Sequence, residues 1–175
     1  MLVLRCTQKL LKKHPGPVDD RQDALVPTLG SWHANLIRLA HSPIVLCVND
    51  ISLIAMLIPG RNFPDFVSAF QHRLVKPLRR MGLTEDAIST ERAAIEIVRI
   101  QPSNSRSVLA SMNDLMRNLK WKVGNHFHFN EADALEDTLS EIPIGALEYH
   151  FPEDVAMAAF GLAQNRYYLP KEINR

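Results

Sequence analysis

Glycine-rich phosphate-binding motifs are missing from this sequence. Its seven glycines are scattered and form neither a G-x-x-x-x-G-K-[ST] loop nor a G-x-G-x-x-G turn, the arrangements that cradle nucleotide phosphates. A G-x-S-x-G elbow, which presents the nucleophilic serine of many hydrolases, is also absent. These absences argue against the commonest nucleotide-using enzymes, and residue spacing alone assembles no Ser-His-Asp site.

Cysteine is scarce as well, since only Cys6 and Cys47 are present and they show no C-x-x-C spacing. The first residues lack the basic segment, long apolar run and small-residue cleavage site of an export signal. The longest apolar stretch, residues 44–59, is interrupted by Asn49 and Asp50, so it cannot cross a bilayer as a helix. We therefore expect a cytoplasmic protein with reduced thiols and no membrane contact.

An excess of positive charge is missing too. Twenty Lys and Arg against 19 Asp and Glu leave a net charge of +1. Proteins that bind nucleic acid duplexes usually carry a clustered basic face, so nucleic acid is not favoured as a partner. What is present is ordinary globular composition, with 46% apolar and 22% charged residues, in a chain long enough for one domain with its own core.

The apolar pattern predicts an α+β fold. Candidate strands occur over residues 2–6, 32–39, 44–48, 51–58 and 95–100. Residues 44–48 and 53–58 are apolar at successive positions, which indicates strands covered on both faces or on one face plus a partner. Asn49-Asp50 is the candidate for a two-residue hairpin turn, and the short connections favour antiparallel pairing. Helical spacing predicts helices near residues 7–13, 62–81, 84–94, 106–123, 130–142 and 152–161.

We therefore expect a single domain over residues 1–165, in which a small, mainly antiparallel sheet packs against several helices. A loose tail over residues 166–175 follows it.

The most informative stretch is R-S-V-L-A-S-M-N-D at residues 106–114, which opens a predicted helix directly after a predicted strand. Arg106 and Asn113 flank one side of its apolar stripe, and Ser107 and Asp114 flank the other. Free backbone N–H groups at a helix start, with an arginine beside them, suit a phosphate or carboxylate. The sequence therefore predicts a polar ligand site at the start of this helix.

The alternative is an ordinary capped helix, in which Ser103, Asn104 or Ser105 supplies the cap. A second polar pair, Gln8 and Lys9, follows the first predicted strand. These two side chains would join the same site if that strand lies beside the strand that ends near residue 100.

A metal centre is not indicated. His126 and His128 would place two imidazoles on one side of a strand, but no cysteine and no clear third ligand stand nearby. Zinc sites use three or four protein ligands. No cofactor is expected either.

Several short motifs resemble those of a family of short, uncharacterised bacterial proteins. They are L-R-C-T-Q-K-L-L at residues 4–11, W-H-A-N-L at 32–36, V-N-D at 48–50 and R-S-V-L-A-S-M-N-D at 106–114. The resemblance covers most of residues 1–114 and departs at Ser105 and Ala110, where the family usually has asparagine and glycine. It implies a domain of unknown function without a mechanism.

Three functions remain open from the sequence. We rank first a small binding or interaction protein, whose partner is an unknown protein or a small anionic ligand bound at the start of the 106–119 helix. A purely structural role of the motifs ranks second. An enzyme acting on a phosphorylated or nucleic-acid substrate, with Arg106, Lys9 and Asp114 in electrostatic roles, ranks third. The candidate ligand-binding residues are Arg106, Ser107, Asn113, Asp114, Gln8 and Lys9.

Overall fold

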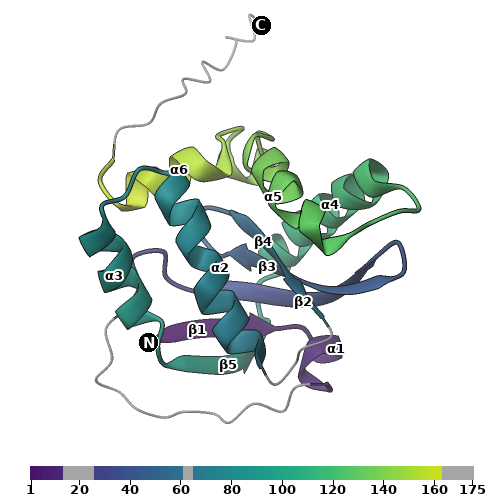
Figure 1. Cartoon of the computed structure of the whole chain (residues 1–175), viewed down its shortest axis with the longest axis horizontal. Coiled ribbons are helices and arrows are strands. Elements are labelled where there is room, and N and C mark those ends of the chain that lie inside the picture. The colour runs from purple at the N-terminus through teal and green to yellow at the C-terminus, as the bar shows by residue number, and fades with distance from the viewer. Residues whose placement is uncertain (14–25, 61–64, 163–175) are drawn as a thin grey trace, which may run out of the picture.

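A computed structural model describes residues 1–13, 26–60 and 65–162. In these ranges five strands form one sheet in the order β4-β3-β2-β1-β5 (Figure 1). The strands are β1 (Leu2–Cys6), β2 (Trp32–Leu39), β3 (Ser42–Asn49), β4 (Ala55–Pro59) and β5 (Val98–Pro102). Strands β2, β3 and β4 form an antiparallel meander, whereas β1 runs parallel to both β2 and β5.

The sheet is therefore mixed, and the expectation of a mainly antiparallel sheet is wrong, although the α+β class holds. Short connections do give antiparallel pairs, but only within the meander. Strand β1 reaches β2 through the long segment 7–31, and β5, which lies near the middle of the chain, pairs with β1 at the start of the chain. Such non-local pairing leaves no mark in the local sequence pattern.

The connection between β3 and β4 also differs from the predicted two-residue turn. Strand β3 continues through Asn49 and β4 begins at Ala55, so residues 50–54 join them. Leu53 in this connection has a left-handed backbone with φ of 57°, which an L-residue adopts only where its surroundings impose it. The strand expected over residues 51–58 is accordingly shorter.

Helices cover both faces of the sheet. They are α1 (Gln8–Leu11), α2 (Phe66–Arg80), α3 (Glu85–Ala94), α4 (Arg106–Val123), α5 (Ala132–Ser140) and α6 (Pro152–Ala159). Figure 1 shows α2 crossing the front of the sheet, with α4 behind it. The tail expected over residues 166–175 lies outside the described residues.

Alternate residues of the strands contribute side chains to two separate hydrophobic cores, because successive side chains of a strand point to opposite faces of the sheet. One core contains Trp32 and Cys47 and packs against α2, where the ring centroid of Phe70 lies 5.3 Å from that of Trp32. The other contains Leu46 and packs against α4 and α5 through side chains such as Met112. Burial on both faces explains why the central strands are apolar at successive positions.

On the α4 side of the sheet, the face formed by β1 and β5 carries polar side chains and is less buried than the two cores. Helix α4 packs over β2 and β3, and on this face β1 and β5 carry the half-buried side chains Arg5, Arg99 and Gln101. Leu2 and Leu4, which point to the other face of β1, are almost fully buried. Polar residues are thus concentrated where β1 and β5 end.

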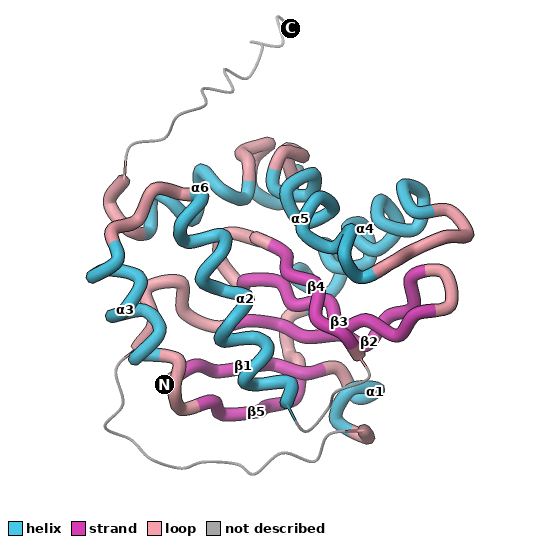
Figure 2. Tube along the Cα trace, in the orientation of Figure 1, coloured by secondary structure: helices cyan, strands magenta, loops and turns pink. Residues whose placement is uncertain are grey.

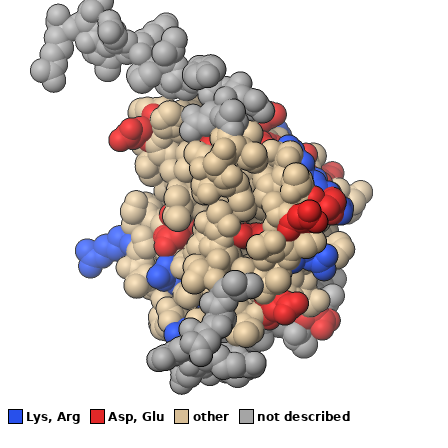
Figure 3. Space-filling view, turned by 90° about the vertical axis from the view of Figure 1, so that its left-hand side faces the viewer, with Lys and Arg blue, Asp and Glu red and all other residues tan. Residues whose placement is uncertain are grey.

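Elsewhere the surface carries mixed charge. Figure 3 looks onto the side of the molecule away from α1, where positive and negative side chains are interspersed. Within the described ranges, no helix combines the length and the apolar character needed to cross a membrane.

Candidate functional site

The candidate site begins where two neighbouring parallel strands end together. Cys6 of β1 lies opposite Pro102 of β5, and the backbone N–H of Ser103 donates to the carbonyl oxygen of Cys6 at 2.9 Å. In Figure 2, β1 and β5 run side by side and α1 follows the end of β1. The first strand therefore does lie beside the strand that precedes the 106–114 motif.

This pairing brings four of the six candidate residues to the same end of the sheet, where β1 and β5 terminate. Gln8 and Lys9 are exposed directly after β1, and Arg106 and Ser107 are exposed directly after β5. They come from distant parts of the chain, so only the parallel pairing of β1 and β5 relates them.

The other two candidates lie elsewhere. Asn113 and Asp114 are exposed two turns further along α4, about 10 Å from Arg106 at the helical rise per residue. The carboxylate of Asp114 lies 3.2 Å from the guanidinium of Arg117, a surface pair of small energetic value. The structure does not join Asn113 or Asp114 to the strand ends.

The start of α4 is capped by Ser105, one of the three expected caps, whose Oγ accepts from the N–H of Val108 at 3.3 Å. The first turn of α4 contains no acidic side chain. The remaining first-turn N–H groups have no acceptor within the helix. The N-terminal end of α4 therefore carries the positive end of the helix dipole, and no acidic side chain in its first turn offsets that charge.

A buried polar network lies next to this helix start, and the sequence did not reveal it. The Oγ of Ser103 lies 2.8 Å from Nδ1 of His33, and Nε2 of the same ring lies 3.3 Å from Oδ1 of Asp50. The second oxygen of Asp50 accepts from Nη1 of Arg5 at 2.8 Å. Four residues from four separate segments are thus connected in one chain of contacts.

Each member is positioned by a strand end. His33 is the second residue of β2 and pairs in register with Arg5 of β1, so both point to the α4 side of the sheet. Asp50 directly follows β3, and its N–H donates to the carbonyl of Ser31 at 2.9 Å. Ser103 directly follows β5.

The Asn49 side chain anchors the connection between β3 and β4, of which Asp50 is the first residue. Its side-chain amide is fully buried and donates to the carbonyls of Leu29 and Ser31 at 2.7 and 3.2 Å. Its Oδ1 accepts from the N–H groups of Ile51 and Ser52 and from the Ser52 hydroxyl. One asparagine thus satisfies the backbone on both sides of Asp50.

The His33 side chain is completely buried, and this burial changes the pKa of its imidazole. Burial lowers its pKa below the ordinary 6.5, the carboxylate of Asp50 partly opposes this shift, and Arg5 adds to it. His33 is therefore neutral at neutral pH. The Asp50 side chain keeps 31% of its surface exposed, so solvent reaches one end of the network.

We expect the free energy of unfolding to fall as the pH drops below about 6.5, the value for an unfolded histidine. In that range the unfolded chain binds a proton that native His33 does not, so acid favours unfolding. Urea titrations between pH 7.5 and 5 would measure this slope. His33→Gln should flatten it, whereas substitution of the exposed His126 should not; equal slopes in both variants would contradict the assignment.

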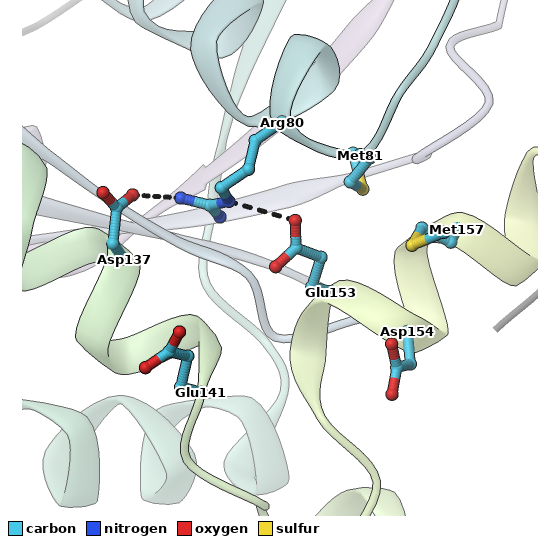
Figure 4. A pocket seen from close by; sticks show the side chains of 7 residues that line it. All are labelled: Arg80, Met81, Asp137, Glu141, Glu153, Asp154 and Met157. Carbon is cyan, nitrogen blue, oxygen red and sulfur yellow. Dashed lines mark hydrogen bonds and ion pairs between the residues drawn. The ribbon is translucent and has the colours of Figure 1, made fainter. Parts of the chain in front are cut away.

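One hollow in the described residues is built around structural ion pairs of Arg80. The hollow in Figure 4, about 210 Å³ in volume, is lined by Arg80 from α2, Asp137 and Glu141 near α5, and Glu153 from α6. Nε of Arg80 donates to Glu153 at 3.0 Å, and its Nη1 contacts Asp137. The arginine thereby ties three helices together, which assigns these carboxylates a stabilising role.

No group of three His, Cys, Asp or Glu side chains suited to a metal ion occurs in residues 1–13, 26–60 and 65–162. The backbone N–H of His128 donates to the Glu131 carboxylate at 3.1 Å in a local capping arrangement. Both predicted metal-ligand candidates, His126 and His128, are exposed.

Sequence reasoning missed Arg5, His33, Asp50 and Ser103 as a group, although each lies within or beside a motif that it singled out. A usable signal was present in β1, where Arg5 interrupts an otherwise apolar strand, and in β2, where the polar residues include His33. A polar side chain in a strand covered on both faces needs a partner. That argument points to the network without identifying its members.

Comparison with known proteins gives one match. The family model described as Domain of unknown function (DUF6933) matches residues 3–155. Neither curated proteins nor solved structures give a match.

Proposed function

Because the chain belongs to the family Domain of unknown function (DUF6933), whose description carries no activity, we propose from geometry alone that the protein binds a small anionic ligand. The proposed site lies at the carboxyl ends of β1 and β5, beside the start of α4.

The observation that carries this proposal is the way the chain leaves the two strands. After β1 it enters α1, whose Leu10 joins the core shared with α2. After β5 it enters α4, which packs on the opposite face. Where neighbouring parallel strands send their connections to opposite faces, ligands of open α/β sheets bind outside the carboxyl ends of those strands.

The charge at this edge supports an anion. Arg5, Lys9 and Arg106 lie near or after the carboxyl ends of β1 and β5, and Asp50 contributes the opposing negative charge. The N-terminus of α4 adds the positive end of the helix dipole. The Arg5 side chain is only 22% exposed, and a small ligand reaches such a group more readily than a protein surface does.

The thiols fit the expectation of a reducing compartment such as the cytoplasm. Cys6 and Cys47 are buried and unpaired with each other. Burial raises the pKa of Cys6 to about 12 and that of Cys47 well above 9. Thiols in this state are inert rather than reactive.

We expect inorganic phosphate, used as the probe, to shift the backbone amide NMR signals of residues 103–107, and Arg106→Ala to weaken that binding about tenfold, or about 1.4 kcal/mol. The loss of one charge-assisted hydrogen bond accounts for an effect of this size. Arg117→Ala is the matched control, because Arg117 is an exposed arginine further along the same helix.

Both arginines are exposed, so neither variant should change the melting temperature appreciably. Strong destabilisation by Arg106→Ala would support the structural role of the motif instead. Shifts spread evenly over the molecule, or equal losses in the two variants, would contradict the proposed site.

A further inference from the structure

The contacts of Ser103, His33 and Asp50 have the order of a nucleophile, a base and a carboxylate. Ser103 Oγ lies 2.8 Å from Nδ1 of His33, and the carboxylate of Asp50 lies 3.3 Å from the other ring nitrogen. A hydroxyl within hydrogen-bond reach of a base that a third group orients is the general signature of an activated nucleophile. Such sites are recognised by geometry rather than by order along the chain.

The protonation state of His33 suits a general base. Nε2 lies 3.3 Å from the negative carboxylate of Asp50 without an aligned hydrogen bond, and this neighbouring charge favours the proton of the neutral ring on Nε2. Nδ1 is then the acceptor, and the Ser103 hydroxyl donates to it. When Nδ1 takes the serine proton, the resulting imidazolium lies beside a carboxylate that stabilises it.

The position of Ser103 suits a nucleophile as well. It stands at the corner between β5 and α4, is more exposed than His33, and its backbone is held by the bond from its N–H to Cys6. The N–H groups of the first turn of α4 follow within a few residues. Backbone N–H groups at a helix start are suited to stabilising a developing oxyanion.

We propose that Ser103 is the nucleophile of an acyl-transfer site, that His33 is its general base, and that Asp50 and Arg5 are positioning residues. The substrate class is a carboxylic ester that carries an anionic group, and the anionic part of this assignment rests on the proposed function.

The reaction proceeds in two balanced halves. Ser103 Oγ bonds to the ester carbonyl carbon while its proton passes to Nδ1 of His33. The bond from the carbonyl carbon to the alkoxy oxygen then breaks, and that proton passes to the departing alcohol. Water repeats both steps on the acyl-serine, which releases the carboxylic acid and restores the Ser103 hydroxyl.

An alkyl fluorophosphonate tests the nucleophile directly in the full-length chain. Ser103 Oγ would bond to phosphorus, fluoride would leave, and His33 would take the serine proton. We expect the intact mass to rise by one phosphonyl group and peptide mapping to locate it at Ser103. Ser103→Ala should abolish labelling, whereas Ser89→Ala, at an exposed serine of α3, should leave the rate unchanged.

The roles of His33 and Asp50 are tested by the rate of fluorophosphonate labelling in variants of each residue. His33→Gln should slow labelling about 100-fold or more, the usual contribution of a general base. Asp50→Asn should slow it as well, and Asp50→Glu should recover part of the rate, which a merely structural role would not predict. Circular dichroism of each variant separates slow labelling from unfolding.

The outcomes separate this inference from the proposed function. Labelling of the unmodified protein at serines other than Ser103, or no faster than free serine, overturns the nucleophile whatever the variants do. Phosphate binding without labelling leaves the anion site and removes the acyl-transfer step. Labelling of Ser103 without phosphate binding retains the nucleophile and removes the anionic group from the substrate.

Discussion

Glu136→Ala is expected to lower the free energy of unfolding by about 3–5 kcal/mol, because it removes one partner of a buried ion pair. Glu136 is 3% exposed, and its Oε1 accepts from Nη2 of Arg73 and from the backbone N–H of Leu57, at 2.7 and 2.6 Å. Alanine would leave the buried N–H of Leu57 without this acceptor and would leave Arg73 with the exposed carboxylate of Asp133 as its partner. Burial raises the pKa of the Glu136 carboxyl, and Arg73 opposes that rise.

The pair also has an architectural role. Arg73 belongs to α2 and Glu136 to α5, which lie on opposite faces of the sheet. Between them runs β4, an edge strand, and the bond from Leu57 to Glu136 satisfies one of its outward N–H groups. An uncovered edge is open to pairing with other chains, so Glu136→Ala should also promote aggregation.

Urea unfolding followed by circular dichroism would measure this effect. Glu85→Ala is the matched control, since it removes an exposed partner of Arg79, and solvent-exposed ion pairs contribute little to stability. The double variant Arg73→Met with Glu136→Met should recover part of the lost stability, because apolar replacement of a whole buried pair is often neutral, while the N–H of Leu57 remains without its acceptor. Losses of similar size for Glu136→Ala and Glu85→Ala would contradict the assignment.

Asn49→Ala is expected to cost about 2–4 kcal/mol, because it leaves several buried backbone groups without hydrogen bonds, and each such group costs about 1–3 kcal/mol where water cannot replace the partner. Those groups are the carbonyl of Leu29 and the N–H groups of Ile51 and Ser52, whereas the carbonyl of Ser31 keeps the bond from the Asp50 N–H.

The same urea unfolding assay would measure this loss of stability. Asn113→Ala is the control, because Asn113 is exposed on α4 and its substitution should change stability by less than about 0.5 kcal/mol. A second readout follows from the position of Asp50 next to Asn49. Freed from its anchor, Asp50 should move from His33, and fluorophosphonate labelling at Ser103 should slow. Unchanged stability in Asn49→Ala would show that water satisfies this connection.

The helices were largely predictable because their evidence is local. The apolar stripe of α4 recurs at helical spacing, and Val108, Met112, Leu115 and Leu119 are buried where the stripe placed them. Gly124 ends the helix as expected. Period and caps are properties of neighbouring residues, so the sequence suffices to recognise them.

The candidate site was predictable only in part, and its residues show why. The helix start at Arg106 and the polar pair Gln8 and Lys9 were visible as local features. Their relation depended on whether β1 lies beside β5, and the pattern of apolar residues does not specify strand order. His33 and Ser103 are 70 residues apart and Arg5 and Asp50 are 45 apart, so no spacing rule connects them.

The sequence by itself determined a globular α+β chain, strands buried on both faces, and a capped helix whose positive start carries Arg106. Only the tertiary structure decided that β1 runs parallel to both of its neighbours. That pairing aligns the carboxyl ends of β1 and β5, places His33 between Ser103 and Asp50, and sends the two following segments to opposite faces. The physical reason is that side-chain periodicity records which face of an element is buried, whereas strand order is set by the packing of the whole chain.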